Sequence, residues 1–321
     1  MIERGRFAPT PSGALHLGSA RTALASALSA WRARGVWALR VEDLDVTRAV
    51  PGAVEAMLDD LRWLGLQWDE GPGASQPHAP YCQSERGGLY REALSVLRAR
   101  GAVYPCACSR REVEMASTAP HGAEPVYPGT CARRDPDEVI FAARQKGREV
   151  SWRFRVDPAR STVTVRDELA GELTQDVARE VGDFVVFRAD GVAAYQLAVV
   201  VDDAVQEVTE VVRGDDLLAS APRQVLLYEA LGASPPRWTH LPLVLGDDGQ
   251  RLAKRHGAMG VRALRERGFE GRTVTRALLE TLGFRDVGEA PLRALAERWD
   301  VTAVPRVSPR WNLLRERFEA S

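Results

Sequence analysis

The first part of the chain alternates strand-like and helix-like segments. Ile2–Ala8 is apolar enough for a short strand, and the Ala/Leu-rich Ser19–Arg34 predicts a helix that Ser19 caps and Gly35 ends. The near-continuously apolar "VWALRVEDLD" predicts a strand buried on both faces, and Pro51–Leu64 predicts a second helix. This alternation is typical of α/β folds, so we expect a Rossmann-like, doubly wound parallel sheet.

Prolines interrupt the stretch between Cys106 and Gln145, which rules out long regular elements there and indicates an inserted module. Further strand-like runs follow, among them "AAYQLAVVVDD" and "VTEVVRG", and then Ser220–Leu231 predicts a helix. We therefore divide the chain into four parts: residues 1–104, the first half of a catalytic domain; 105–146, the inserted module; 147–260, the second half of the catalytic domain; and 261–321, a short helical C-terminal region.

The composition is that of an ordinary globular protein, with 45% hydrophobic and 27% charged residues. No apolar run is long enough to span a bilayer, and the N-terminus lacks the apolar segment of a signal peptide. We therefore expect a cytoplasmic protein without a membrane partner. The net charge of −1 means that a nucleic-acid-binding surface must be a local patch.

The loop between the first strand and the first helix, "TPSGALHLGS", is rich in residues that can contact phosphates. Ligands of open parallel sheets bind at the carboxyl ends of the strands, where the N-terminus of the next helix attracts anions. Gly13 and Gly18 allow the backbone to come close, and Ser12 and His16 can donate hydrogen bonds. A Pro/Gly turn that only joins strand to helix is an equally good interpretation of this loop taken alone.

A second loop, "LAKRHGA" at Leu252–Ala258, is basic and follows an apolar strand. Alone, it reads as a solvated loop. Together, however, "HLGS" and "LAKRH" resemble the two signature motifs of class I aminoacyl-tRNA synthetases. Ser19 replaces the final histidine of the first motif and Ala253 replaces a serine of the second, whereas His16, Gly18 and Lys254 are present.

Longer runs of sequence narrow the resemblance to one branch of this class. "RFAPTPSGALHLGSARTAL", "LRVEDLD" and "LAKRHG" resemble the glutamyl branch of the class, and "YPGTC" and "VTEVVRGDDLLASAPRQ" resemble the family of glutamyl-queuosine tRNA(Asp) synthetases, short paralogues of glutamyl-tRNA synthetase. The similarity extends from Gly5 to about Gly260. It implies an enzyme that activates L-glutamate with ATP and Mg²⁺, and then transfers the glutamate to the queuosine base in the anticodon of tRNA(Asp).

The resemblance also implies site residues. His16, Gly18 and Lys254 would bind ATP, and His16 and Lys254 would be catalytic. The residues implied for glutamate are Arg6, Phe7, Ala8, Pro9, Thr10, Glu42, Tyr195 and Arg213.

Two of these roles have alternatives. On spacing alone, Asp43 and Asp45 compete with Glu42 for the glutamate ammonium group, and the resemblance selects Glu42. An arginine is the expected partner of a substrate carboxylate, but a surface ion pair is the alternative for Arg6 and for Arg213.

Three of the four cysteines lie close together in the sequence: Cys106, Cys108 and Cys131. They indicate one structural Zn²⁺ per chain, in a module that contacts the acceptor RNA, with reduced free thiols as the alternative. Tetrahedral zinc needs a fourth ligand, and the resemblance puts Tyr127 there. His121 is the chemically conventional rival and Asp135 is also possible, whereas Cys82 is left over and is expected to be inert.

The best candidate for phosphate contacts is Arg251–Arg272, where seven Lys/Arg face two Asp/Glu, a local charge of +5. A solvated helix face is the alternative. Little sequence follows Lys254, where glutamyl-tRNA synthetases have a long anticodon-reading region, and we therefore expect the queuosine acceptor. The rivals are a truncated glutamyl-tRNA synthetase that charges a tRNA 3′ end and a catalytically silent RNA-binding protein.

Overall fold

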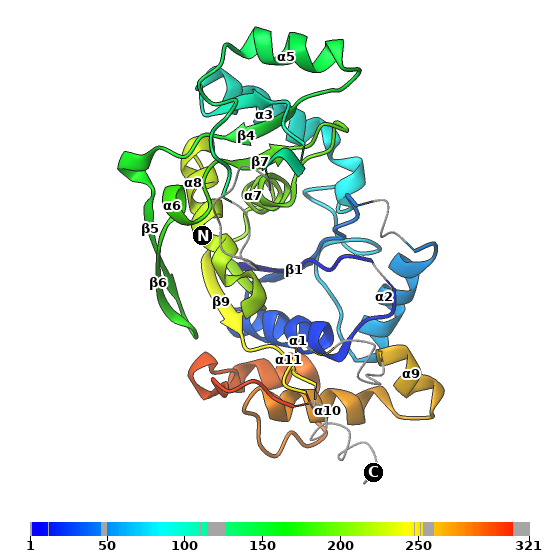
Figure 1. Ribbon diagram of the computed structural model, residues 1–321. Helices are drawn as coiled ribbons and strands as arrows, with labels where there is room; N and C mark the ends of the chain where they lie inside the picture. The colour runs from blue at the N-terminus through cyan, green and yellow to red at the C-terminus, as the bar shows by residue number, and fades with distance from the viewer. Residues whose placement is uncertain are drawn as a thin grey trace.

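The computed structural model describes residues 2–11, 13–45, 50–109, 111–113, 126–246, 248–250, 252 and 260–310. Among these residues, a six-stranded main sheet has the strand order β2-β1-β8-β9-β5-β6 (Figure 1). Its strands are β1 (Arg4–Phe7), β2 (Val36–Leu39), β5 (Thr162–Asp167), β6 (Gly171–Asp176), β8 (Glu210–Gly214) and β9 (Arg237–Leu241). Neighbouring strands are parallel from β2 to β5, and β6 is antiparallel to β5. The predicted parallel α/β sheet is therefore confirmed for five strands, and the complete sheet is mixed.

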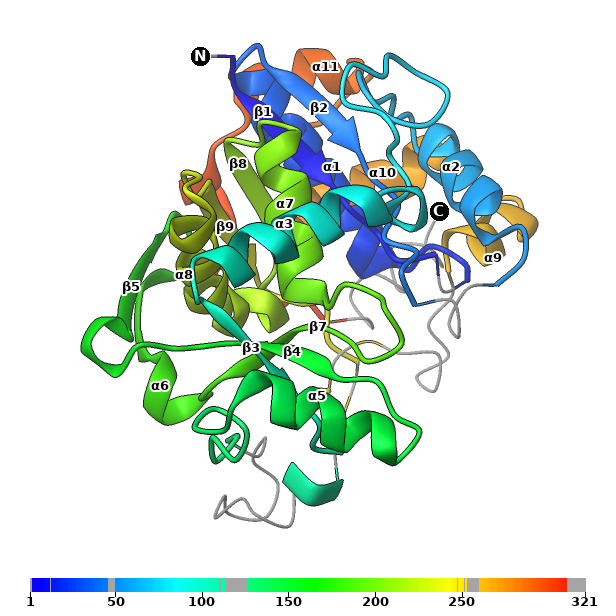
Figure 2. The same cartoon turned by 90° about the horizontal axis from the view of Figure 1, so that it is seen from above.

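Helices cover both faces of the main sheet (Figures 1 and 2). On one face, α1 (Leu17–Arg32) packs against β1 and β2, with α10 (Gly271–Thr281) and α11 (Leu292–Leu295) beyond it. On the other face lie α3 (Gly87–Ala99), α7 (Tyr195–Val205) and α8 (Ala221–Leu231). Each face has its own apolar core, as a doubly wound sheet requires.

Helix α1 lies very close to β1 because the contact is made by small residues. A side-chain carbon at Gly5 would come within 3.0 Å of the Cβ atom of Ala30, so glycine permits this approach. The helix begins at Leu17, two residues before the predicted cap Ser19, and the side chain of His16 does not cap it. The N-terminus of α1 therefore lies at the carboxyl end of β1, where the sheet binds ligands.

One predicted strand is a helix. The run "AAYQLAVVVDD" was expected to be extended, but it forms α7, in which every residue from Gln196 to Asp203 is buried. A helix buried on all sides has no polar face, so its 3.6-residue period is hidden in the sequence. The prediction is wrong because a short apolar run of this kind has the same pattern in a buried strand and in a buried helix.

A small antiparallel sheet lies beside the inserted segment. It has the order β3-β4-β7, formed by β3 (Val103–Cys106), β4 (Ser151–Phe154) and β7 (Phe184–Phe187). The segment between β3 and β4 begins and ends at two strands that pair with each other. Contrary to the prediction, it contains a regular helix, α5 (Pro136–Gln145), because Pro136 occupies the first turn, where proline is tolerated. The predicted domain boundaries remain predictions.

The described part of the chain contains further helices. They are α2 (Ala53–Trp63), α6 (Val177–Glu180), α9 (Val261–Glu266) and the 3₁₀ helices Gln83–Glu85, Pro158–Arg160, Asp215–Ser220, Ala296–Arg298 and Val301–Ala303. Buried Arg21 of α1 donates to Thr281 Oγ1 at 2.9 Å and to the Pro242 carbonyl at 2.8 Å, which ties the C-terminal helices to α1. In the described part of the chain, no helix has both the length and the apolar character needed to cross a membrane.

Candidate active site

A pocket of about 840 Å³ lies at the carboxyl ends of β1 and β8. It is lined by all the described residues that the sequence predicted for glutamate and ATP: Arg6, Phe7, Ala8, Pro9, Thr10, His16, Gly18, Glu42, Tyr195 and Arg213. Tyr195 comes from the first residue of α7 rather than from the predicted strand. Segments far apart in the sequence therefore meet at one place, although the contacts with ligands remain predictions.

One end of the pocket is formed by the loop that follows β1. Gly13 has a φ of 127°, a backbone conformation that favours glycine. Gly18 lines the pocket from the first turn of α1, and a side-chain carbon there would meet only Val244, at 4.0 Å, so a side chain would extend into the pocket. The positive end of α1 thus borders the pocket, which favours the phosphate-binding interpretation over a plain turn.

The first residue of the second motif, Leu252, and the residues just after the motif lie beside this loop. Leu252 lines the pocket, Gly260 forms a β-bridge with His16, and the Val261 N–H donates to the Leu15 carbonyl at 2.8 Å. Lys254 stands between Leu252 and Gly260 in the sequence but lies outside the described residues. Its catalytic role therefore remains a prediction.

Glu42 and Asp43, two carboxylates that follow β2, have different environments. Glu42 lines the pocket, and its Oε1 accepts a hydrogen bond from Arg40 Nη2 at 3.2 Å. Burial raises the pKa of Glu42, and the Arg40 guanidinium opposes that shift, so a cation in the pocket would stabilise the ionised carboxylate. Asp43 instead accepts from the Ser84 N–H at 2.8 Å and from Ser84 Oγ at 2.6 Å. Glu42 is thus better placed than Asp43 to bind an ammonium group.

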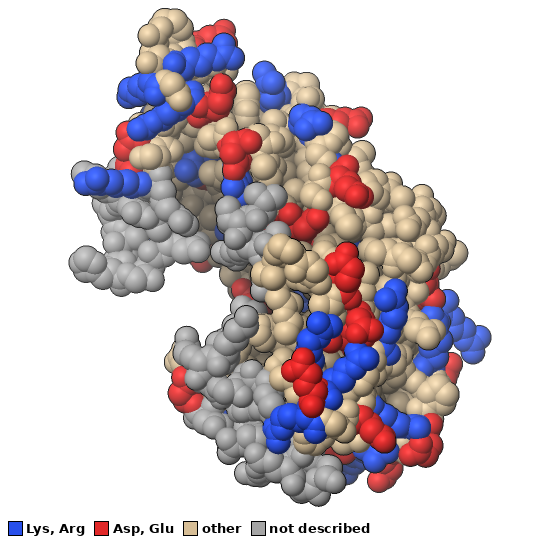
Figure 3. Space-filling view, turned by 90° about the vertical axis from the view of Figure 1, so that its right-hand side faces the viewer, with Lys and Arg blue, Asp and Glu red and all other residues tan. Residues whose placement is uncertain are grey.

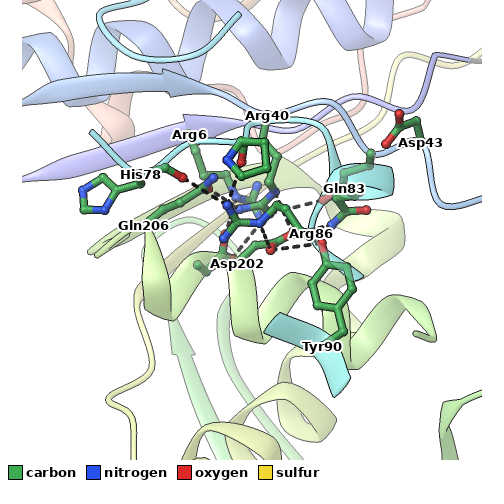
Figure 4. Close-up of polar contacts among 12 residues, drawn as sticks. Arg6, Arg40, Asp43, His78, Gln83, Arg86, Tyr90, Asp202 and Gln206 are labelled. Atoms are coloured by element: carbon green, nitrogen blue, oxygen red, sulfur yellow. Dashed lines mark hydrogen bonds and ion pairs between the residues drawn. The ribbon is translucent and has the colours of Figure 1, made fainter. Parts of the chain in front are cut away.

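A buried ion network connects Arg6, which lines the pocket, to α7 (Figure 4). Asp203 accepts hydrogen bonds from Arg6 Nε at 3.2 Å, from Arg6 Nη2 at 3.3 Å and from Arg40 Nη1 at 2.7 Å. The neighbouring Asp202 accepts from Arg86 Nε at 2.6 Å. Arg6 is only 4% exposed, so the alternative of a surface ion pair is wrong for this residue. Its carboxylate partner within the protein was not predicted from the sequence.

Arg213, the other predicted arginine, has a different environment. It is buried, its Nε donates to His240 Nε2 at 2.9 Å, and its Nη2 donates to the Leu217 carbonyl at 3.2 Å. Its Nη1 has no hydrogen-bond partner among the described residues, and burial lowers the pKa of the guanidinium. A buried guanidinium with an unsatisfied N–H group at a pocket wall is a binding site for an anion.

The three clustered cysteines form a candidate metal site. Their Sγ atoms all lie within 4.8 Å of one another, and those of Cys108 and Cys131 are 3.6 Å apart. Thiolates on a tetrahedral zinc ion, with Zn–S bonds of about 2.3 Å, are about 3.8 Å apart. The Tyr127 hydroxyl lies 3.4 Å from Cys106 Sγ and 3.6 Å from Cys108 Sγ. These four donors fit a tetrahedral metal ion.

The surroundings of the cysteine cluster bear on which residue could be the fourth metal ligand. Asp135 caps α5, accepting from the N–H groups of residues 137 and 138 at 2.9 and 3.1 Å, so its carboxylate already has a structural role. The rival ligand His121 lies outside the described residues. Arg153, which sequence reasoning missed, donates from Nε to Cys106 Sγ at 3.4 Å and lies over the Tyr127 ring, 3.8 Å from its centre. Its positive charge favours deprotonated ligands.

The leftover cysteine differs from the other three. Cys82 is half-buried, and burial raises the pKa of its thiol to about 11. A thiol with so high a pKa is mostly protonated at neutral pH and reacts slowly. This environment agrees with the expectation that Cys82 is inert.

The predicted basic patch is partly neutralised. Within Arg251–Arg272, Arg262 and Arg265 pair with Asp59 at 3.9 and 2.6 Å, and Arg272 pairs with Glu289. Figure 3 shows Lys and Arg intermixed with Asp and Glu at this end of the molecule, and a second gathering of Lys and Arg on the lobe that carries α5. Exposed basic residues of the inserted module include Arg111, Arg133, Arg134, Arg144 and Lys146. The RNA contacts remain a prediction.

Comparison with known proteins agrees with this geometry. Residues 4–312 match the catalytic domain of the tRNA synthetases class I (E and Q). The chain is 52% identical to a glutamyl-Q tRNA(Asp) synthetase of Symbiobacterium thermophilum, with 94% of both chains covered. It is 43% identical to glutamate–tRNA ligase 1 of Halorhodospira halophila, over 97% of this chain and 65% of that one.

A solved structure shows the same fold. The crystal structure of a glutamate tRNA ligase from Elizabethkingia meningosepticum, in complex with its amino acid, superposes with a TM-score of 0.85 at 27% identity. The superposition covers 99% of this chain and 69% of the ligase. The chain therefore belongs to the class I tRNA synthetases for glutamate and glutamine, and within them to the glutamyl-Q tRNA(Asp) synthetases, a family of ligases.

Proposed function

We propose that this protein activates L-glutamate with ATP and transfers the glutamate to the queuosine base of tRNA(Asp). The observation that carries the proposal is the pocket, which brings together a buried arginine with an unsatisfied N–H group, the carboxylate of Glu42 and the positive end of a helix. These are the groups that a free dicarboxylic amino acid and a nucleotide phosphate require. The names of the similar glutamyl-Q tRNA(Asp) synthetases support the choice of acceptor.

The glutamate would lie between Glu42 and Arg213. Glu42 would bind the ammonium group, and Nη1 of Arg213 would bind the side-chain carboxylate. Tyr195 would form one wall, and Arg6, held by Asp203, would add positive charge nearby. The remaining contacts would come from the segment after β1 and include Phe7, Ala8, Pro9 and Thr10.

In the first step, an oxygen of the α-carboxylate attacks the α-phosphorus of ATP. The bond to the β-phosphate breaks, pyrophosphate leaves, and glutamyl-adenylate forms. Because two anions react, catalysis depends on positioning and on neutralisation of charge. His16 and the backbone around Gly18 would hold the phosphates, with Mg²⁺ bound to ATP, and Lys254 would stabilise the charge that develops on the triphosphate.

In the second step, a hydroxyl of the queuosine cyclopentene ring attacks the carbonyl carbon of the adenylate, and AMP leaves. The ring carries two neighbouring hydroxyls, which resemble the ribose diol of a terminal adenosine. One active site therefore suits either acceptor, and the RNA element that docks decides which one reacts. Tyr127 and the three cysteines would hold one structural Zn²⁺ in the inserted module, because their donor atoms fit its tetrahedral geometry.

Exchange of labelled pyrophosphate into ATP tests the activation step. We expect exchange that requires glutamate and that aspartate and glutamine do not support. The assay is run with and without tRNA, because some activation sites are complete only when RNA is bound. No exchange under either condition would identify the chain as a catalytically silent RNA-binding protein.

A further inference from the structure

Three adjacent strands place three polar side chains in a line that ends at the pocket. The strand order is β8-β9-β5, and these strands carry Arg213, His240 and Asp167 respectively. Arg213 and His240 are register partners. Arg213 Nε donates to His240 Nε2 at 2.9 Å, and His240 Nδ1 lies 2.6 Å from Asp167 Oδ2. All three side chains are buried, so water does not compete for these bonds.

The bonding pattern defines the protonation of His240. A guanidinium N–H can only donate, so Nε2 of His240 must accept and must carry no proton. The imidazole is then neutral with its proton on Nδ1, which donates to Asp167. Burial lowers the pKa of His240, which agrees with a neutral ring. The less common tautomer of histidine is thus fixed by the carboxylate behind it.

Asp167 is itself held rigidly. Its Oδ1 accepts from the N–H groups of Leu169 and Ala170 at 3.0 and 2.7 Å, and both oxygens accept from the backbone N–H of His240. Three backbone N–H groups therefore donate to the Oδ1 position, and an asparagine in this place would keep its oxygen there. The Oδ2 position faces the imidazole. In Asp167→Asn, the amide nitrogen would occupy the Oδ2 position and donate to His240 Nδ1. The proton would move to Nε2 and oppose the Nε–H of Arg213.

We propose that Asp167 and His240 are positioning residues that orient Arg213 toward the side-chain carboxylate of the substrate; this rests on the proposed binding of glutamate by Arg213. His240 and the Leu217 carbonyl fix Nε and Nη2, and Nη1 is left for the ligand. A guanidinium fixed in the plane of two bonds binds a carboxylate with defined geometry, which distinguishes glutamate from shorter or neutral analogues.

The tautomer of His240 is measured directly by nitrogen NMR on histidine-labelled wild-type protein. We expect one of the five histidine rings to be neutral and protonated on Nδ1, and His240→Gln to remove that signal. If no ring has this tautomer, or if the signal survives in His240→Gln, the proposal is wrong. A wild-type spectrum without such a ring contradicts the proposal even when a variant fails to fold, and the measurement does not depend on activity.

The kinetic test uses Asp167→Asn in the pyrophosphate-exchange assay. Because one donor of Arg213 loses its acceptor, we expect the KM for glutamate to rise about 10-fold or more, with little change in the KM for ATP. The matched control is Asp176→Asn in β6, whose carboxylate accepts from Ser161 Oγ at 2.7 Å. It should leave both KM values unchanged.

A double-mutant cycle shows whether Asp167 acts through Arg213. Asp167→Asn should have little further effect in the Arg213→Ala background, since the group that it positions is gone. Equal effects in both backgrounds, or equal rises in both KM values, would mean a general structural role. If wild-type protein shows no glutamate-dependent exchange, the proposed function fails instead, and the NMR result still decides the tautomer of His240.

Discussion

Asp203 and Arg6 are joined by two buried hydrogen bonds, 3.2 and 3.3 Å long, between α7 and β1. The same carboxylate binds Arg40, so one anion on α7 pairs with two cations, one in β1 and one directly after β2. Asp203→Ala would leave both guanidinium groups without this partner. We expect the free energy of unfolding to fall by about 3–5 kcal/mol in denaturant titrations.

The control for this variant is Asp190→Ala, which breaks an exposed pair with Arg188 and should change stability very little. The pH dependence has a defined sign. Burial raises the pKa of Asp203, but Arg6 and Arg40 outweigh burial, and the net pKa lies below the usual 3.8. The stabilisation is therefore present above that pH and is lost as the pH falls through the pKa of the folded state. A similar loss of stability in both variants would contradict the importance of the network.

Glu42 and Asp43 are neighbours with different expected roles. Glu42→Gln removes the charge that would bind the ammonium group, so the KM for glutamate should rise about 10-fold or more while the fold is retained. Asp43→Asn weakens the two bonds to Ser84 and should lower the melting temperature with an unchanged KM. Measuring both parameters for both variants separates the roles, and a reversed pattern would give the ammonium site to Asp43.

Lys254 offers a direct test of the phosphate end of the pocket. Lys254→Ala should reduce the maximal rate of pyrophosphate exchange about 100-fold, because charge that develops in the transition state loses a cation. Lys146, the other lysine of the chain, is exposed on the inserted module and provides the matched control. If Lys254→Ala exchanges pyrophosphate at nearly the wild-type rate, as the control Lys146→Ala should, Lys254 has no part in the mechanism.

The purified protein should contain about one zinc ion per chain by elemental analysis. Cys108→Ser should lose the metal, and Cys82→Ser should keep it, because Cys82 lies outside the cluster. Tyr127→Phe compared with His121→Ala identifies the fourth ligand, and we expect the tyrosine variant to bind zinc more weakly. Metal-free protein prepared without chelators would show that the cysteines are ordinary reduced thiols.

Local sequence signals predicted much of the fold and the glycine-containing loop at one end of the pocket. Strand, glycine loop and helix follow one another from Ile2 to Arg34, and such signals act within a few residues. The family resemblance supplied the residues expected to bind glutamate, Tyr195 and Arg213 among them, although the helix that carries Tyr195 was expected to be a strand. A buried helix shows no amphipathic period, and this explains the error.

The supporting residues were not predictable in the same way. Asp203 meets Arg6 across 197 positions of the sequence, and Asp167 meets His240 across 73. Neither pair lies in a motif, and each is formed only when separate strands and helices pack together. The sequence pattern therefore identified residues at the pocket wall, while the residues that orient them emerged from the tertiary structure.

The most direct test of the account compares acceptors for radiolabelled glutamate. We expect label on tRNA(Asp) that contains queuosine, and none on queuosine-free tRNA(Asp) or on tRNA(Glu). Periodate treatment of the RNA should block labelling by cleaving the queuosine diol, whereas removal of the 3′-terminal adenosine should have no effect. Labelling of tRNA(Glu), or labelling that requires an intact 3′ end, would contradict the account and identify a truncated glutamyl-tRNA synthetase.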